Sequence, residues 1–203
     1  MLISKALVEI PPKFAGRPPV HPGHDAHKRY RGAQGLAEDL RFYGRWVRDE
    51  AERRIGRLYP KARLPDGSEA TVIAWLWART MRSPDPRARG AMVPLVSSLL
   101  LSTKKGKKAW VEPVIIPSAP DGWRFNLRTG ALGKADEERL KSGTKSAKGQ
   151  AFICVLTGSA IDRGYIQAEG KADRLSARLM AIVAEGKSGR TYVGPDIEHE
   201  AIA

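Results

Sequence analysis

Hydrophobic residues near the start of the chain recur at three- and four-residue spacing, which predicts a long amphipathic helix over residues 36–58. The residues on this apolar stripe are Leu36, Leu40, Tyr43, Val47, Ala51, Ile55 and Leu58. Charged residues such as Arg45 and Glu52 occupy the other side, and Pro60 ends the helix. Residues 1–10 have similar spacing and predict a short helix, whereas the Pro- and Gly-rich residues 11–35 predict a loop.

Apolar runs in the middle of the chain predict strands. The first covers residues 69–79, where Trp75 and Trp77 are two apart and therefore point to the same face. Further strands are predicted at 93–103, 109–116, 123–128 and 152–156. Residues 129–149 are rich in Gly, Ser and Lys and are expected to be flexible.

Leu175, Leu179, Ile182 and Val183 have helical spacing, which predicts a C-terminal helix over residues 174–184. These elements together predict an α+β fold. We expect a helical segment (1–63), a small antiparallel β insert (64–168), and a C-terminal helix with a tail (169–203).

Length, hydropathy and cysteine content exclude several classes of protein. The chain has 203 residues, enough for one core, and its apolar runs are shorter than a membrane-spanning helix needs. The N-terminus lacks the pattern of a signal peptide. Cys154 is the single cysteine and cannot form an internal disulfide, so a cytoplasmic location is expected, with no membrane partner.

The net charge of +13 is concentrated in the middle of the chain, where residues 79–148 hold 15 basic and 6 acidic side chains. Such a region favours a polyanion partner, and DNA is the expected one. The predicted contacts are Lys104, Lys105, Lys107 and Lys108 in a turn between two strands, together with Arg79 and Arg82. The alternative is a hairpin tip that its lysines keep soluble.

Other candidate chemistry is sparse. Tryptophans on the predicted strands could stack on bases, but packing of a small β core is the favoured interpretation. His21, His24 and His27 lie in the Pro-rich loop and are interpreted as polar loop residues rather than metal ligands. The sequence contains no P-loop, no Gly-x-Gly-x-x-Gly and no nucleophile elbow, so it offers no catalytic residues.

Several long stretches, in the same order, resemble the middle portion of the bacterial adenine-specific DNA methylases that carry a zinc-ribbon insert. They are KALVEIPPKFAGRPPVHP from Lys5, GAQGLAEDLRFYGRWVRDEAERRIGRLYPK (32–61), LPDGSEATVIAWLWART (64–80), LSTKKGKKAWVEPV (101–114) and YIQAEGKADRLSARLMAIVAEG (165–186). The resemblance implies that the β insert is a degenerate zinc ribbon.

The family's ribbon has two cysteine pairs, and the resemblance places them at Ser83 and Arg89 and at Cys154 and Thr157. Cys154 is the one remaining ligand-type residue, and one thiolate cannot hold a structural zinc ion, which takes four ligands. We therefore expect no metal, and a region 81–160 that is either loosely ordered or held by its tryptophans.

The resemblance also implies that the catalytic parts lie outside this sequence. The Gly-rich loop for S-adenosylmethionine and the Asp-Pro-Pro-Tyr motif for the flipped adenine are absent, so no cofactor-binding or catalytic residue is carried over. The leading hypothesis is a methyltransferase fragment, inactive alone, that binds DNA or completes a split methylase with a companion chain. The alternatives are a non-catalytic scaffold, a decaying gene product, or one piece of a longer gene.

Overall fold

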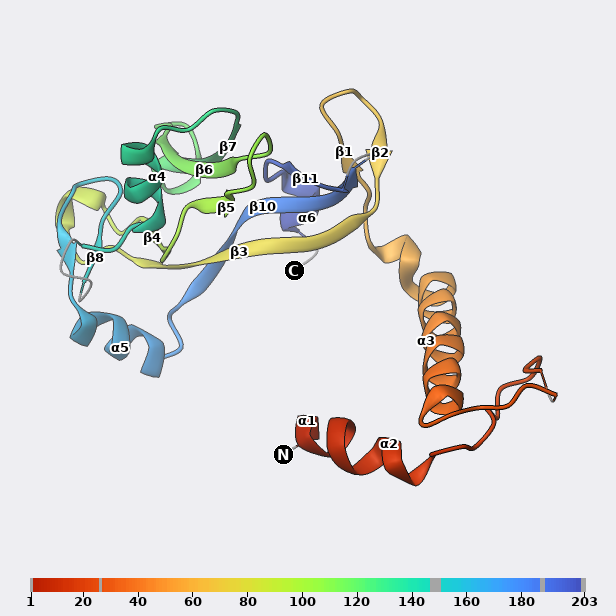
Figure 1. Cartoon of the computed structure of the whole chain (residues 1–203). Helices are drawn as coiled ribbons and strands as arrows, with labels where there is room; N and C mark the ends of the chain where they lie inside the picture. The colour runs from red at the N-terminus through yellow and green to blue at the C-terminus, as the bar shows by residue number, and fades with distance from the viewer. Residues whose placement is uncertain (1, 26, 147–150, 187–188, 202–203) are drawn as a thin grey trace. The chain divides into compact units, whose positions relative to one another are not determined.

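The computed structural model describes residues 2–25, 27–146, 151–186 and 189–201. The chain divides into two units, Met1–Tyr59 and Pro60–Ala203. It contains both helices and antiparallel sheets, which confirms the α+β class (Figure 1). None of the helices in the described ranges combines the length and the apolar character that crossing a membrane requires.

The first unit is helical. Its elements are α1 (Leu2–Ser4), the π-helical η1 (Lys5–Glu9), α2 (Ile10–Lys13), α3 (Gln34–Ile55) and the 3-10 turn η2 (Gly56–Leu58). The prediction of a helix over 36–58 is therefore confirmed. The helix predicted for residues 1–10 runs on through Pro11 and Pro12, because prolines are tolerated in the first turn of α2.

The loop between α2 and α3 is anchored on α3 by hydrogen bonds. The Asp39 carboxylate accepts the backbone N–H groups of Val20 (3.0 Å) and His21 (2.9 Å), and the His21 ring stacks on Phe42. The His24 ring hydrogen-bonds the His21 carbonyl. Among the described residues, no three His, Cys, Asp or Glu side chains group as metal ligands.

The second unit is built from antiparallel strands. A four-stranded sheet has the order β11-β10-β3-β4, with strands Gly189–Val193, Ser176–Gly186, Val72–Arg82 and Met92–Leu95. A three-stranded sheet has the order β5-β6-β7, with strands Leu100–Ser102, Ala109–Ile115 and Trp123–Thr129. Two small hairpins complete the sheets, namely β1 (Ala62–Arg63) with β2 (Glu69–Ala70) and β8 (Phe152–Ile153) with β9 (Ala160–Ile161).

Short helical elements connect and flank these strands. They are η3 (Pro86–Ala88), η4 (Pro120–Gly122), α4 (Lys134–Lys141), α5 (Arg163–Lys171) and α6 (Ile197–Glu200). Asp162 and Asp196 cap α5 and α6 by accepting a backbone N–H of the first turn. The segment 129–149 was predicted to be flexible, and this was wrong for 134–141, where Glu137 and Lys141 pair and Leu140 is buried. Residues 147–150 lie outside the described residues.

The main core lies between the two sheets. Ala78 of β3 and Ala181 of β10 are small enough to let the three-stranded sheet approach closely, and Trp110, Trp123 and Phe125 fill the space. The tryptophans of β6 and β7 therefore pack the core, as the favoured interpretation predicted. Trp75 and Trp77 pack together against a second cluster that contains Leu179 and Ile182.

The prediction of a C-terminal helix at 174–184 was wrong, because these residues form strand β10. This strand pairs with β3 and β11 at its edges, and its two faces pack on different core clusters, one containing Ala181 and the other Ile182, so Leu179 to Ala184 are almost continuously buried. A strand buried on both faces loses the alternation that identifies strands, and its apolar run then resembles a helix pattern. The prediction of a single strand at 93–103 was also wrong, because this segment forms two strands, β4 and β5, that belong to different sheets.

An ion pair ties the end of α5 to the start of β10. The Arg174 guanidinium contacts the nearly buried Glu169 carboxylate at 2.6 Å, and the Arg174 N–H donates to the Glu169 carbonyl at 3.0 Å. Hydrogen bonding by Arg174 lowers the pKa of Glu169 below its ordinary value of 4.5. The fold is therefore expected to depend on the ionised form of Glu169.

We predict that Glu169→Gln makes the stability of the chain less dependent on pH in acid. The lowered pKa stabilises the folded state at pH values above about 4.5, and this stabilisation is lost as pH falls through the lowered pKa. The variant lacks this contribution, so its urea midpoint is lower at pH 7 and converges with that of the wild type as the pH falls through the lowered pKa. Glu198→Gln, at an exposed carboxylate, is the matched control; an equal effect of both changes would contradict the prediction.

Candidate nucleic-acid interface

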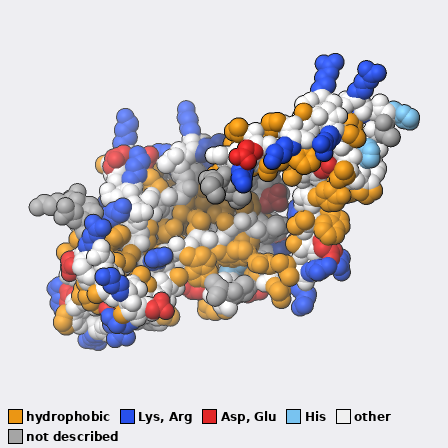
Figure 2. Space-filling model, turned by 90° about the horizontal axis from the view of Figure 1, so that it is seen from below, with side chains coloured by type: hydrophobic (Ala, Val, Ile, Leu, Met, Phe, Trp, Pro, Cys, Tyr) orange, Lys and Arg blue, Asp and Glu red, His pale blue; other side chains and the backbone are white. Residues whose placement is uncertain are grey.

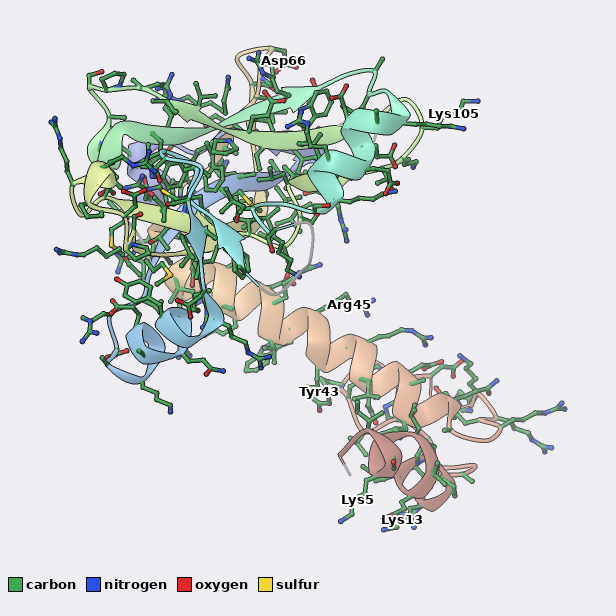
Figure 3. All side chains as sticks on the ribbon, turned by 90° about the vertical axis from the view of Figure 1, so that its left-hand side faces the viewer. Lys5, Lys13, Tyr43, Arg45, Asp66 and Lys105 are labelled. Atoms are coloured by element: carbon green, nitrogen blue, oxygen red, sulfur yellow. The ribbon has the colours of Figure 1, made fainter. Side chains whose placement is uncertain are left out.

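The basic turn predicted at Lys104–Lys108 joins β5 to β6 in an antiparallel hairpin. The Lys107 N–H donates to the Lys104 carbonyl at 2.9 Å, and Gly106 has the positive φ of 74° that this tight turn requires. Lys104, Lys105 and Lys107 are exposed, and Figure 3 shows Lys105 projecting away from the ribbon. The hairpin therefore presents three ammonium groups at its tip.

Lys108 differs from the other three lysines. Its ammonium contacts the Glu137 carboxylate of α4 at 2.8 Å and donates to the Leu132 carbonyl at 3.2 Å. This lysine holds α4 against the hairpin, so its contribution to a DNA surface is reduced. The ion pair could not be predicted from the sequence, because residues 129–149 were expected to be flexible.

Arg79 and Arg82 lie on β3, in the four-stranded sheet rather than in the sheet of the hairpin. Both are exposed, and Arg82 is close enough to Glu169 to lower the pKa of that carboxyl. The structure therefore divides the six predicted DNA contacts between two sheets.

A further basic residue, Arg190 of β11, lies beside the hairpin. A cavity of about 250 Å³ opens between the hairpin turn and β11 and is lined by Ser102, Lys104, Lys107, Gly189, Arg190 and Tyr192. Sequence analysis missed Arg190 and Tyr192. The available signal was the short run of strand-forming residues Thr191 to Val193 directly after Gly189.

The residues that the resemblance places at zinc-ligand positions come together in part. The Ser83 hydroxyl, in the loop after β3, donates to the Cys154 Sγ at 3.4 Å, and both residues are buried. The Thr157 hydroxyl also hydrogen-bonds Cys154. Arg89, in contrast, is exposed in a left-handed conformation after η3. We call Ser83, Asp85, Cys154 and Thr157 the Ser83–Cys154 cluster.

Hydrogen bonds link the two loops of the Ser83–Cys154 cluster. The Asp85 side chain hydrogen-bonds Thr157 and Ser159 across the loops, and the Arg87 guanidinium and N–H hold the pKa of the Asp85 carboxyl well below its usual range. Burial raises the pKa of the Cys154 thiol, but hydrogen bonds from Ser83, Thr157 and two backbone N–H groups lower it by more. The net effect is a thiol pKa below its ordinary value. The loops are thus joined by hydroxyl and carboxylate groups.

The Ser83–Cys154 cluster does not fit a zinc ion. Structural zinc takes thiolates and imidazoles, and here one thiol is accompanied by two neutral hydroxyls. The region 81–160 was expected to be loosely ordered or held by its tryptophans. Its described residues pack around Trp110 and Trp123, which supports the second alternative.

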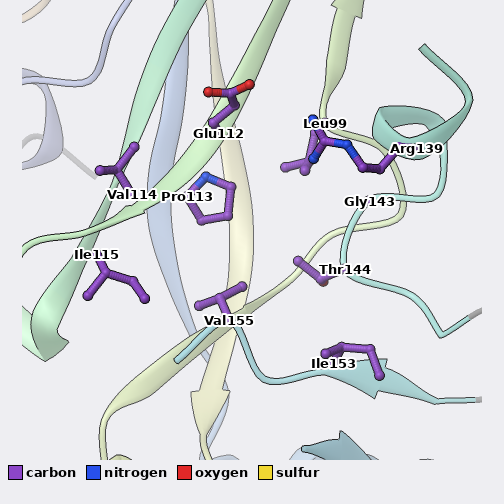
Figure 4. A pocket seen from close by; sticks show the side chains of 10 residues that line it. All are labelled: Leu99, Glu112, Pro113, Val114, Ile115, Arg139, Gly143, Thr144, Ile153 and Val155. Atoms are coloured by element: carbon purple, nitrogen blue, oxygen red, sulfur yellow. The ribbon is translucent and has the colours of Figure 1, made fainter. Parts of the chain in front are cut away.

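A second cavity, of about 640 Å³, lies between β6 and residues 139–144 and 153–155 (Figure 4). Its lining is mostly apolar and includes Leu99, Val114 and Ile153. Its ionised groups already have partners, since Glu112 accepts from the Trp110 indole and Arg139 pairs with Asp136. The lining offers no nucleophile beside a base, and therefore no basis for a catalytic proposal.

Comparison with family models, with curated proteins and with solved structures found no match to this chain.

Proposed function

We propose that this chain is an accessory piece of an adenine-specific DNA methylase, inactive alone, that binds DNA through the basic hairpin. A companion chain would supply the S-adenosylmethionine site and the target-base motif, which this sequence lacks. The observation that carries the proposal is the gathering of Lys104, Lys105 and Lys107 at one hairpin tip, with Arg190 beside them.

The charge around the hairpin tip favours a phosphate backbone as its partner. Among the described residues, no carboxylate forms an ion pair with Lys104, Lys105 or Arg190. Lysines that contact phosphates position a duplex without reading its sequence. This role suits a chain that orients DNA for a separate catalytic subunit.

The exposed apolar stripe of α3 supports docking on a companion chain. On this stripe, Leu40, Tyr43 and Val47 are 66%, 43% and 57% exposed, which is unusual for large apolar residues of one helix. Figure 3 shows Tyr43 and Arg45 on different sides of α3, and Figure 2 shows hydrophobic side chains at the surface among basic ones. Such an amphipathic helix is suited to lie in the groove of a partner.

The test is the salt dependence of binding to duplex DNA, measured by fluorescence anisotropy. We expect K104Q/K105Q/K107Q to weaken binding at least about tenfold near 0.1 M salt and to reduce the log–log salt slope by roughly 2.7, if each lysine neutralises one phosphate. The control K61Q/K145Q/K171Q removes the same charge at exposed positions outside the hairpin and should leave the slope nearly unchanged.

Two outcomes would contradict the proposal. Binding of S-adenosylmethionine by the purified chain alone would show that it has its own cofactor site, and methyl transfer to DNA would show that it is a complete enzyme. A flat or absent salt response of the wild type would favour the alternative function, a non-catalytic scaffold without a nucleic-acid role.

A further inference from the structure

We propose that the cavity between the β5–β6 turn and β11 is a binding pocket for a single phosphate group. The inference rests on the proposed function for the source of the phosphate, which would be a DNA backbone. Its lining unites Ser102, Lys104 and Lys107 with Arg190 and Tyr192, which are more than eighty residues away in the sequence.

The two sides of the pocket are fixed to each other. The Tyr192 hydroxyl donates to the Leu101 carbonyl of β5 at 2.9 Å, which ties β11 to the hairpin. The Lys104 N–H donates to the Ser102 Oγ at 3.3 Å, so the serine hydroxyl hydrogen remains available for a ligand. The 2.9 Å bond across the turn holds Lys104 and Lys107 at its two ends. The backbone segments that carry the basic side chains are therefore held together before any ligand binds.

The charge of the pocket favours an anion. Two ammonium groups and one guanidinium line it, and no described carboxylate belongs to the lining. Glu185 lies opposite Arg190 in the β10–β11 ladder but forms no ion pair with it among the described residues. The Arg190 guanidinium can thus donate two of its N–H groups to two phosphate oxygens.

The size of the pocket limits the ligand. A volume of about 250 Å³ is below the roughly 300–1,000 Å³ of sites that enclose drug-sized molecules. The pocket accommodates one phosphate group, whereas a complete nucleotide would extend into solvent. This is the geometry needed to grip one backbone phosphate while the rest of the hairpin tip lies along the duplex.

The test is a titration with inorganic phosphate, followed by ¹⁵N–¹H NMR of the full chain, against sodium chloride at equal ionic strength. We expect saturable shifts at the amides of Ser102, Lys104, Lys107 and Arg190, which Arg190→Gln weakens about tenfold or more, because it removes a charged hydrogen-bond donor. Arg163→Gln, at an exposed arginine of α5, should leave them unchanged. Uniform shifts, or equal shifts with chloride, would overturn the proposal.

A second arm repeats the phosphate titration in the presence of duplex DNA. If DNA blocks the phosphate-induced shifts, the pocket takes a backbone phosphate. If the shifts persist while DNA is bound, the pocket serves a free phosphate group instead. The first arm contains no DNA, so it tests the phosphate pocket by itself. The proposed function fails separately, if the wild type does not bind DNA.

Discussion

Trp123→Ala is expected to lower the free energy of unfolding of the second unit by about 3–5 kcal/mol, which is the cost of truncating a buried aromatic side chain. Trp123 is fully buried between the sheets, and its ring meets Phe125 edge-to-face at 4.9 Å and the Arg178 guanidinium at 4.7 Å. Its indole N–H donates to the Met92 carbonyl at 2.7 Å. The substitution removes all three contacts and leaves a cavity.

The expected loss is a large share of the 5–15 kcal/mol that stabilises a typical domain, and it corresponds to a fall in melting temperature of roughly 10 °C. Urea unfolding followed by far-ultraviolet circular dichroism measures it. Ile73→Ala is the control within the same unit, because the Ile73 side chain of β3 is 50% exposed and its truncation should cost less than about 1 kcal/mol. Equal midpoints for the two variants would show that Trp123 does not join the sheets.

Local patterns predicted the elements whose two faces differ. The helix at 36–58 and the strand at 123–128 were found because their apolar positions recur with the period of a helix or a strand, and the strands at 69–79 and 109–116 because they are short apolar runs rich in Trp, Val and Ile between turn residues. The strand β10 was missed because it is buried on both faces, so its polar positions do not alternate, and because its apolar run is rich in Leu, Met and Ala, which also suit a helix. The helix α4 was missed because its segment is almost entirely polar and depends on tertiary ion pairs with Lys108 and within the helix.

The candidate interface was predictable only where its residues are adjacent in sequence. The run of lysines at 104–108 is visible without a structure, and so is the turn that Gly106 permits. The engagement of Lys108 by Glu137, and the arrival of Arg190 beside Lys104, depend on how β11 and α4 pack around the hairpin. Such long-range pairings leave no periodic signal in one sequence.

The double variant Ser83→Cys/Thr157→Cys is expected to create a zinc site, if the insert derives from a zinc ribbon. Thiolates of a tetrahedral zinc site lie about 3.8 Å apart, given a Zn–S distance of about 2.3 Å. The Ser83 Oγ and Cys154 Sγ are already 3.4 Å apart, and Thr157 hydrogen-bonds Cys154. Asp85, which reaches Thr157 across the loops, can supply a fourth ligand.

The variant should bind zinc with a Kd of about 1 μM or lower. This is roughly a thousandfold tighter than the wild type, because three thiolates replace one. With zinc at a hundred times Kd, binding adds about 2.7 kcal/mol to the stability of the folded state. Cobalt(II) absorption and metal analysis of the dialysed protein measure the binding, and adding Asp85→Asn should weaken it. Ser97→Cys/Thr129→Cys, with two cysteines at exposed positions, should bind no better than the wild type. If the Ser83→Cys/Thr157→Cys variant binds zinc no better than the wild type, the two loops do not have the ligand geometry of a zinc ribbon.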